Sequence, residues 1–458
     1  MAISFCGKRI LLKTLCISKR FQHGFIVLVP EIGEDLPEKN PFFQNDGLPE
    51  FNNITVENCR AAIAKQAVDF ETGIKAIEKR LVEKPHKDIF KVIFEPLEEL
   101  GASLNRTWGL SKTLYLGNST LMPISSYMLI HDRARQARAS KFNNKEIYKA
   151  VKYELQSNEG RSCEKTRILQ KFAVEGNLNG LELESVKQIL LRECLNKLAK
   201  EKDTFKQKIE VSTKQFTHVI NDNSIVREFP DVLLRAISHN PNYPLNGPWK
   251  ITLNSHVYMP VMKYCSDREI RWNLWQASVS RGSGYRDRDL ATSINLEEIR
   301  YIRRNIAKLL GYESYVEMSM ETKMAGSLSN VQNMLHILLQ NARPAQKEEL
   351  KNLHHFALDR GFKAETLELW DIPYWRRKQQ ISLFDYDEDK FKEYFPLPKV
   401  LEGLFQLCEK LFNIFIKQNN SISTWHKDVK FYDIFEPHSS APVAGFYLDP
   451  YARSEKKM

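Results

Sequence analysis

Histidine and acidic side chains are the natural starting point, because these residues hold the metal in hydrolytic zinc sites. Such a site commonly uses His-Glu-x-x-His on one helix, where both histidines bind the ion and the glutamate polarises the metal-bound water. The chain has 11 histidines: His23, His86, His131, His218, His239, His256, His336, His354, His355, His426 and His438. No two of them are four positions apart, so the motif is absent from these 458 residues.

Two histidine and aspartate pairs are the nearest substitutes for that motif. Each pair has the i, i+4 spacing that places two side chains on one face of a helix. The pairs are His218 with Asp222 and His355 with Asp359. Pairs of this kind are ordinarily contacts on an exposed helix surface, so we predict no metal ligand among them.

Other hydrolytic schemes also lack their residues. The sequence contains no Gly-x-Ser-x-Gly elbow, no cysteine in a known nucleophile context and no Gly-x-x-x-x-Gly-Lys phosphate loop. Paired carboxylates do occur, at Glu98 with Glu99 and at Asp387 with Asp389. Adjacency in sequence does not aim two groups at one bond, so we expect these carboxylates to be exposed. We therefore predict no catalytic and no metal-binding residue, and the substrate-binding residues stay unknown.

The cysteines favour a reducing compartment. They are odd in number, scattered and never in a Cys-x-x-Cys pair, which argues against both a disulfide framework and a zinc knuckle. They are Cys6, Cys16, Cys59, Cys163, Cys194, Cys265 and Cys408. No stretch approaches the roughly 18 apolar residues that cross a bilayer, so we expect no membrane insertion.

The positive charge is concentrated at the start of the chain. The formal net charge is +10, and the cations before the first acidic residue, Glu31, are Lys8, Arg9, Lys13, Lys19 and Arg20. In the rest of the chain cations alternate with acids on helical faces, so we expect no nucleic acid partner.

Residues 1–30 alternate these cations with apolar residues and lack acids, which is typical of an amphipathic mitochondrial transit peptide. This pattern predicts the mitochondrial matrix. A disordered leader or a misassigned start codon remains the alternative, and a cytoplasmic location would then follow. A secretory signal is disfavoured because Lys13 interrupts the apolar run. Residues 31–49 are polar and rich in proline, and they form the predicted linker to the body of the chain.

The body shows the periodicity of amphipathic helices, so we predict a mainly α fold. Apolar residues recur at spacings of three and four in several stretches. These include Ile74, Ile77 and Leu81; Val186, Ile189, Leu190, Cys194, Leu195 and Leu198; and Ile299, Ile302, Ile306, Leu309 and Leu310. Gly311 is the expected C-cap of the last of these, and a further helix should start near Ser329 and stop before Pro344.

The strongest apolar stripe lies late in the chain. It opens after Pro396 and Pro398 and consists of Val400, Leu401, Leu404, Phe405, Cys408, Leu411, Phe412 and Phe415, for which we expect a core-packing role. Residues 249–253, 429–435 and 443–448 instead combine β-branched and aromatic residues between turns, which predicts a small sheet. The lysine-rich stretch at 202–214 fits either a domain linker or a continuous charged helix.

Several segments, taken in order, resemble the oligopeptidase A and thimet oligopeptidase family of zinc metallopeptidases, with oligopeptidase A and organellar oligopeptidase as the nearest members. The most specific are Trp425-His426-Lys427-Asp428-Val429 and Gly445-Phe446-Tyr447-Leu448-Asp449-Pro450-Tyr451-Ala452-Arg453. The others are residues 95–99, 104–108, 258–269, 280–282, 309–315, 322–325, 342–344, 370–375 and 394–397.

This resemblance implies a two-lobed, neurolysin-like helical fold, a deep channel for short peptides, and one zinc ion held by His-Glu-x-x-His and a later Glu. It implies an N-terminal helical domain at 50–205 and the N-terminal part of a catalytic domain at 206–458, without the zinc-binding part. Pro450 departs from the leucine usual in the family, and the sequence stops before the family's zinc helix. We therefore expect this chain to be inactive by itself and to bind no zinc.

Three functional readings follow from the resemblance. The first is a metalloendopeptidase that degrades short peptides in the organelle, seen here without its catalytic helix. The second is a short product that binds peptides or a partner without cleaving them. The third is a processing enzyme that resembles mitochondrial intermediate peptidase. We expect a monomer, and we expect further helices to cover apolar faces such as that of Leu404, Leu411 and Phe415.

Overall fold

We describe the fold from a computed structural model of the chain. The described residues are 40–43, 47–83, 88–157, 161–240, 242–386, 388–453 and 455–456. The predicted transit peptide and most of the predicted linker lie outside them. The chain divides into two compact units, of which unit 1 comprises residues up to 181 together with those from 400 onward, and unit 2 comprises 182–399.

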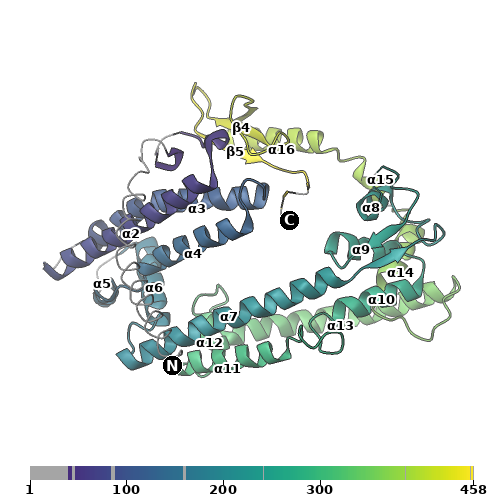
Figure 1. The fold of residues 1–458 in the computed structure, drawn as a ribbon, viewed down its shortest axis with the longest axis horizontal. Helices are drawn as coiled ribbons and strands as arrows, with labels where there is room; N and C mark the ends of the chain where they lie inside the picture. Colours follow the sequence, from purple (N-terminus) through teal and green to yellow (C-terminus); the bar gives the residue numbers. More distant parts are fainter. Residues whose placement is uncertain are drawn as a thin grey trace, which may run out of the picture. The chain divides into compact units, whose positions relative to one another are not determined.

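Unit 1 is built around a long helix, α2 (Val56–Glu83), against which α3 and α4 pack (Figure 1). Ile63, Phe70 and Ile77 of α2 and Leu104 of α3 are almost fully buried and belong to one core. The remaining helical elements are η2 (Pro41–Phe43), η3 (Phe51–Asn53), η4 (Phe90–Phe94), α3 (Glu95–Gly117), α4 (Ile124–Ser140), α5 (Lys145–Gln156) and α6 (Cys163–Leu178). The side chain of Asn144 caps α5 by accepting from the backbone amides of Glu146 and Ile147.

A three-stranded antiparallel sheet completes unit 1. Its strands are β3 (Phe415–Gln418), β4 (Lys430–Phe435) and β5 (Ala444–Leu448), in the order β3-β4-β5. Tyr432 of β4 stands opposite Phe446 of β5, and their rings stack with centroids 5.3 Å apart. The predicted small sheet is therefore confirmed for residues 429–435 and 443–448, whereas residues 249–251 pair with residues 218–220 in a separate sheet. Strand β3 was not predicted, because its first residue, Phe415, had been included in the apolar stripe.

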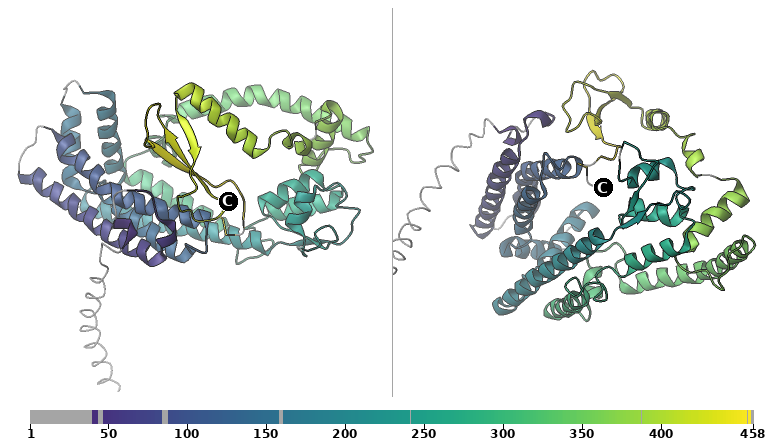
Figure 2. Two further views of the ribbon diagram at one scale, coloured as in Figure 1. Left: turned by 90° about the horizontal axis from the view of Figure 1, so that it is seen from above. Right: turned by 45° about the vertical axis from the view of Figure 1, so that its right-hand side comes forward.

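Unit 2 pairs two helices along their length, α7 (Ser185–Gln215) and α11 (Ser293–Leu309), and Figure 2 shows further views of them. Its other helices are α8 (Asp231–Ile237), α9 (Ser255–Tyr264), α10 (Arg268–Val279), α12 (Tyr315–Met320), α13 (Leu328–Leu358), α14 (Ile372–Phe384) and α15 (Glu388–Lys392). Two short strands, β1 (His218–Ile220) and β2 (Trp249–Ile251), form an antiparallel pair. The lysine-rich stretch at 202–214 lies within the continuous helix α7.

The end of α11 follows the sequence signal. Gly311 has φ +83°, a left-handed conformation that glycine adopts without strain. The amide of Gly311 donates to the carbonyl of Lys308 and that of Tyr312 to the carbonyl of Ala307, the two bonds of a Schellman cap. The predicted C-cap is confirmed.

The prediction that a helix stops before Pro344 is wrong. Helix α13 runs from Leu328 to Leu358 with Pro344 inside it, and its N-cap is Ser327. A proline inside a helix removes one backbone hydrogen bond and crowds the carbonyl four residues earlier, which together cost about 3 kcal/mol. The second half of α13 is held by burial of Leu353, Phe356 and Ala357, which outweighs that loss.

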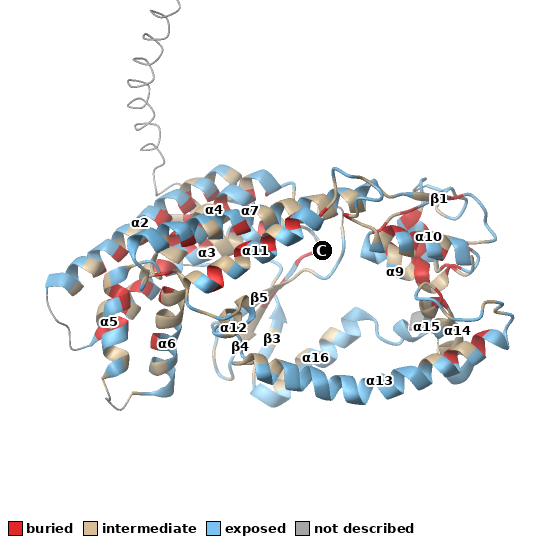
Figure 3. Ribbon diagram, turned by 90° about the horizontal axis from the view of Figure 1, so that it is seen from below, coloured by how far each residue is buried: buried red, intermediate tan, exposed pale blue. Residues whose placement is uncertain are grey.

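The apolar stripe from Val400 to Phe415 differs from expectation in two ways. Helix α16 (Leu397–Phe412) begins one residue before Pro398. It is followed by Asn413, whose φ of +53° is left-handed. The expected core-packing role holds only in part, because Phe405 contacts Tyr432 and Phe446, whereas Leu404 is 49% and Leu411 67% exposed. Figure 3 shows α16 without buried positions.

The prediction of a mainly α fold with small sheets is confirmed. Among the described residues, no helix has the length and apolar character needed to span a membrane.

Candidate functional site

The histidine and aspartate pairs singled out in the sequence do not form metal sites. His218 lies on β1 and Asp222 in the loop that follows, so the helical spacing inferred for this pair is wrong. His355 lies on α13, and Asp359 is the C-cap of that helix. Throughout the ranges that the structure describes, no three His, Cys, Asp or Glu side chains gather as a metal site would require. The described residues therefore do not fit the zinc ion that the resemblance implies, and we derive no step through one.

The paired carboxylates are likewise unremarkable. Glu98 and Glu99 are exposed on α3, as expected for solvated acids. Asp387 lies outside the described residues, and Asp389 falls in the short helix α15.

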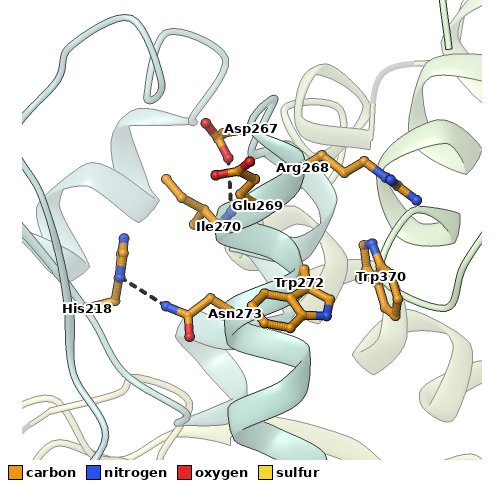
Figure 4. A pocket seen from close by; sticks show the side chains of 8 residues that line it. All are labelled: His218, Asp267, Arg268, Glu269, Ile270, Trp272, Asn273 and Trp370. Carbon is orange, nitrogen blue, oxygen red and sulfur yellow. Dashed lines mark hydrogen bonds between the residues drawn. The ribbon is translucent and has the colours of Figure 1, made fainter. Parts of the chain in front are cut away.

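A pocket of about 680 Å³ in unit 2 is a candidate binding site. It is lined mainly by the start of α10, with contributions from His218 of β1 and from Trp370, which lies just before α14 (Figure 4). The lining residues are His218, Asp267, Arg268, Glu269, Ile270, Trp272, Asn273 and Trp370. His218 thus lies at a pocket, although not as half of a helical pair.

Local sequence rules explain how α10 presents these side chains. Asp267 is the N-cap, and its carboxylate accepts a hydrogen bond of 2.9 Å from the amide of Ile270. One helical turn further, the side-chain amide of Asn273 forms a hydrogen bond of 3.3 Å with Nδ1 of His218, which links β1 to the helix. Figure 4 shows the carboxylates of Asp267 and Glu269 near the first turn and the indoles of Trp272 and Trp370 further along.

A buried ion cluster behind the pocket holds α10 against the start of α14. The carboxylate of Asp371, which is fully buried, accepts from Arg268 at 2.9 Å and from Arg271 at 3.0 Å. Arg271 also donates to the carbonyls of Cys265, Ser266 and Trp370, so its guanidinium has partners on every side. The pKa of Arg268 is raised mainly by the hydrogen bond that Arg268 itself donates to Asp371. The cluster is built to hold charge in place rather than to transfer protons.

The residues that line the pocket suit the binding of a cation. Glu269 is exposed and Asp267 is half-buried at the N-cap, and neither has a described cation in ion-pair contact, whereas the charge of Arg268 is balanced by Asp371. Indole faces beside carboxylates attract organic cations such as an amino group or a Lys or Arg side chain. Burial raises the pKa of the nearby Cys265 thiol to about 11, so this cysteine is no nucleophile.

A second ion cluster, in unit 1, joins the two most specific family-like segments. The carboxylate of Asp449 accepts hydrogen bonds from Arg453 at 2.7 Å, from the indole of Trp425 at 3.0 Å and from Lys456. Burial alone would raise the pKa of Asp449, but these donors outweigh it and lower the pKa to about 2. Arg453 also donates to the carbonyl of Gly117, which fastens the turn after β5 to the end of α3.

Sequence reasoning missed both clusters as units, although their segments had been noted. Asp371 looks like any helix-capping aspartate, and Arg271 looks like a surface cation. The arginines three positions apart at 268 and 271 are a usable signal, because that spacing places both on one face of α10.

Comparison with known proteins finds the family that these segments resemble. The model of peptidase family M3 matches residues 261–458, a range that includes both clusters. The chain is 30% identical over 426 residues to oligopeptidase A of Haemophilus influenzae, covering 91% of this chain and 61% of that protein. It is 28% identical to the "Organellar oligopeptidase A, chloroplastic/mitochondrial" of Arabidopsis thaliana, covering 93% of this chain and 54% of that protein.

A third relative, "Probable cytosolic oligopeptidase A" of Arabidopsis thaliana, is 29% identical and matches 93% of this chain and 61% of its own length. The chain thus spans 54 to 61% of the length of these relatives. The family match and these relatives together support a member of the oligopeptidase A and thimet oligopeptidase family.

Proposed function

We propose that this chain is part of a zinc metalloendopeptidase that hydrolyses short peptides in a deep channel. The observation that carries the proposal is the collinear similarity to oligopeptidases over more than nine tenths of the chain. Residues 50–205 would form the N-terminal helical domain and residues 206–458 the N-terminal part of the catalytic domain.

We further propose that the 458 residues by themselves do not hydrolyse peptides, because His-Glu-x-x-His is absent from them. Without a metal-bound water the amide bond lacks an activated nucleophile. The test is to incubate the purified chain with short fluorogenic peptides, with and without a chelator, and to measure its zinc content. We expect no chelator-sensitive cleavage and no stoichiometric zinc. Peptide cleavage that a chelator blocks, or stoichiometric zinc in the purified chain, would overturn this proposal.

A second candidate function is peptide binding without cleavage, which the pocket beside α10 favours. The exposed carboxylate of Glu269, the half-buried carboxylate of Asp267 and the indole of Trp272, which is 44% exposed, suit the free amino end of a peptide. We expect a short peptide to bind this chain. The N-acetylated form of the same peptide should bind more weakly, because it lacks the charged amino group.

The matched variants are Trp272→Ala and Tyr285→Ala. Both remove an aromatic ring from unit 2, but Tyr285 lies outside the pocket and is fully exposed. Removal of a cation–π partner worth about 0.5 to 2 kcal/mol predicts a dissociation constant about 2-fold to 30-fold higher for Trp272→Ala. Calorimetric titration checks this, and equal affinities for the two variants would refute a role for the pocket.

A processing enzyme that resembles mitochondrial intermediate peptidase remains a third candidate. Short peptides and a precursor protein with an intact presequence separate it from the first candidate. Preferential trimming of the precursor by a protein that includes this chain together with a zinc helix would favour processing.

We also propose that residues 1–30 direct the protein to the mitochondrial matrix, which their cations and lack of acids support. The chain's relatives include both an organellar and a cytosolic protein. Fusion of residues 1–30 to a fluorescent protein tests the address, and a cytoplasmic signal would contradict it. We propose a monomer, for which a native mass near 53.4 kDa is expected.

A further inference from the structure

A basic pocket in unit 1 has no role in the function proposed above. Its volume is about 410 Å³, and it combines three rings with four cations. The lining residues are Trp108, His131, Arg135, Arg138, Ala139, Lys141, Phe142 and Lys171. They come from α3, α4, the segment after α4, and α6.

Helix geometry gathers the cations on one side. Arg135, Arg138 and Lys141 follow one another at intervals of three, which places them along one face at the end of α4. Helix α6 adds Lys171, and the contact between Phe142 and Phe172, with centroids 4.7 Å apart, holds α6 against that end of α4.

Most of the positive charge of this pocket has no acidic partner in ion-pair contact among the described residues. Arg135 lies 3.7 Å from Asp132 in an ion pair that is largely exposed. Within the part of the chain that the structure describes, Arg138, Lys141 and Lys171 make no such pair. Burial, and then the charges of Arg138 and Lys171, lower the pKa of Lys141, which Glu175 offsets only in part.

Aromatic rings hold the cations without cancelling their charge. The guanidinium of Arg138 lies 4.7 Å from the centre of the Trp108 indole, and the ammonium of Lys141 lies 5.0 Å from the centre of the Phe142 ring. The Trp108 indole in turn donates to Nδ1 of His131 at 3.2 Å. Such contacts restrict the cationic side chains before a ligand arrives, which lowers the entropy lost on binding.

We propose that this pocket binds the polyphosphate group of a small-molecule anion. A carboxylate would neutralise only one of the three unpaired cations, whereas a triphosphate carries enough charge for all of them. The guanidinium of Arg138 suits bidentate contact with a phosphate, and the two lysines act as point charges. The rings offer apolar surface to any organic group attached to the phosphates.

The experiment is a calorimetric titration of the full chain with inorganic tripolyphosphate and, separately, with ATP, at about 150 mM salt, where diffuse surface attraction is screened. We expect one molecule to bind per chain. Binding of ATP at least about 3-fold tighter than tripolyphosphate identifies a nucleotide-type ligand, and equal affinities identify an inorganic one.

The test variant is Arg138→Gln with Lys171→Gln, which should raise the dissociation constant at least about 10-fold. The matched control is Lys347→Gln with Lys351→Gln, a pair of exposed lysines on α13 that should change it less than about 2-fold. The proposal would be overturned if neither anion bound. It would also be overturned if both double variants lost affinity to the same extent.

A second measurement needs no substitution. Bound tripolyphosphate should slow acetylation of Lys141 at least about 5-fold and leave that of Lys347 unchanged. Equal protection of the two lysines would show that the anion has no specific seat in this pocket.

Discussion

The two ion clusters use the same kind of residues in different surroundings. In unit 2 the Asp371 carboxylate is fully buried and its partner Arg271 is 2% exposed. In unit 1 the side chain of Asp449 is 12% exposed, and its partner Lys456 is 19% exposed. Because a buried charge without its partner is far more costly than an accessible one, the two aspartates should differ in importance despite their similar hydrogen bonds.

The clusters also differ in what they connect. Asp371 binds α10 to the start of α14, about 100 residues apart, and it accepts a further hydrogen bond from the amide of Glu368. Asp449 binds mainly its own turn, through Arg453 and Lys456, and reaches the rest of unit 1 through the indole of Trp425. Loss of Asp371 should therefore loosen unit 2 as a whole, whereas loss of Asp449 should loosen one end of unit 1.

The largest predicted effect is that of Asp371→Asn. The substitution leaves Arg268 and Arg271 without a counter-charge, and the second of these is buried, so we expect a loss of about 3 to 5 kcal/mol in the free energy of unfolding. Urea unfolding measures the loss. Hydrogen exchange should show faster amide exchange in α10 and α14 and unchanged exchange in α2.

The control for that variant is Asp359→Asn, which removes an exposed aspartate of unit 2 and should change stability by less than about 0.5 kcal/mol. A similar small change for Asp371→Asn would show that the cluster holds nothing together.

We expect Asp449→Asn to have a smaller effect, about 2 kcal/mol. The lowering of the pKa from 3.8 to about 2 corresponds to roughly that energy, at about 1.4 kcal/mol for each pKa unit. Faster exchange should be confined to unit 1, near β5 and the end of α3. Asp69→Asn, an exposed aspartate on α2, serves as its control, and equal losses for the two variants would contradict the assignment.

The sequence predicted the elements of both clusters better than their pairing. Periodicity located helices such as α11, because Ile299, Ile302 and Ile306 face the core at helical spacing. The family resemblance marked residues 258–269 and 370–375 as separate segments. It could not show that Arg271 reaches Asp371, because a contact between residues 100 positions apart depends on tertiary packing and not on local propensity.

Short or exposed elements were the hardest to predict. Strand β1 has three residues, too few for an alternating pattern, so His218 was assigned to a helix. Proline inside α13 and the apolar stripe of α16 were misjudged for a related reason, since periodicity reports which face is apolar but not what covers it. The cations at 135, 138 and 141 could have been noticed from their spacing, whereas Lys171 could not.

Acid provides a third way to separate the clusters. The folded-state pKa of Asp449 is below its unfolded value, so its stabilisation is fully present above about pH 4 and is lost as pH falls through about 2. The difference of about 2 kcal/mol between the wild type and Asp449→Asn should therefore disappear between about pH 4 and pH 2. Urea unfolding of both proteins across this range measures it, and a difference that persists at pH 2 would contradict the lowered pKa.

The smallest predicted effect tests the contact between Trp425 of the Asp449 cluster and Gly117 at the end of α3. A methyl group added at Gly117 would lie 2.5 Å from Nε1 of Trp425, the atom that donates to Asp449. Gly117→Ala should therefore displace the indole and destabilise unit 1 by about 1 to 2 kcal/mol. Gly109→Ala in the same helix has no atom within 4 Å of the added methyl group, so helix propensity alone should stabilise it by up to about 1 kcal/mol. Changes in the free energy of unfolding with opposite sign for the two variants would show that Gly117 is needed for close packing under Trp425. Equal increases in stability for both variants would show that the indole moves without cost.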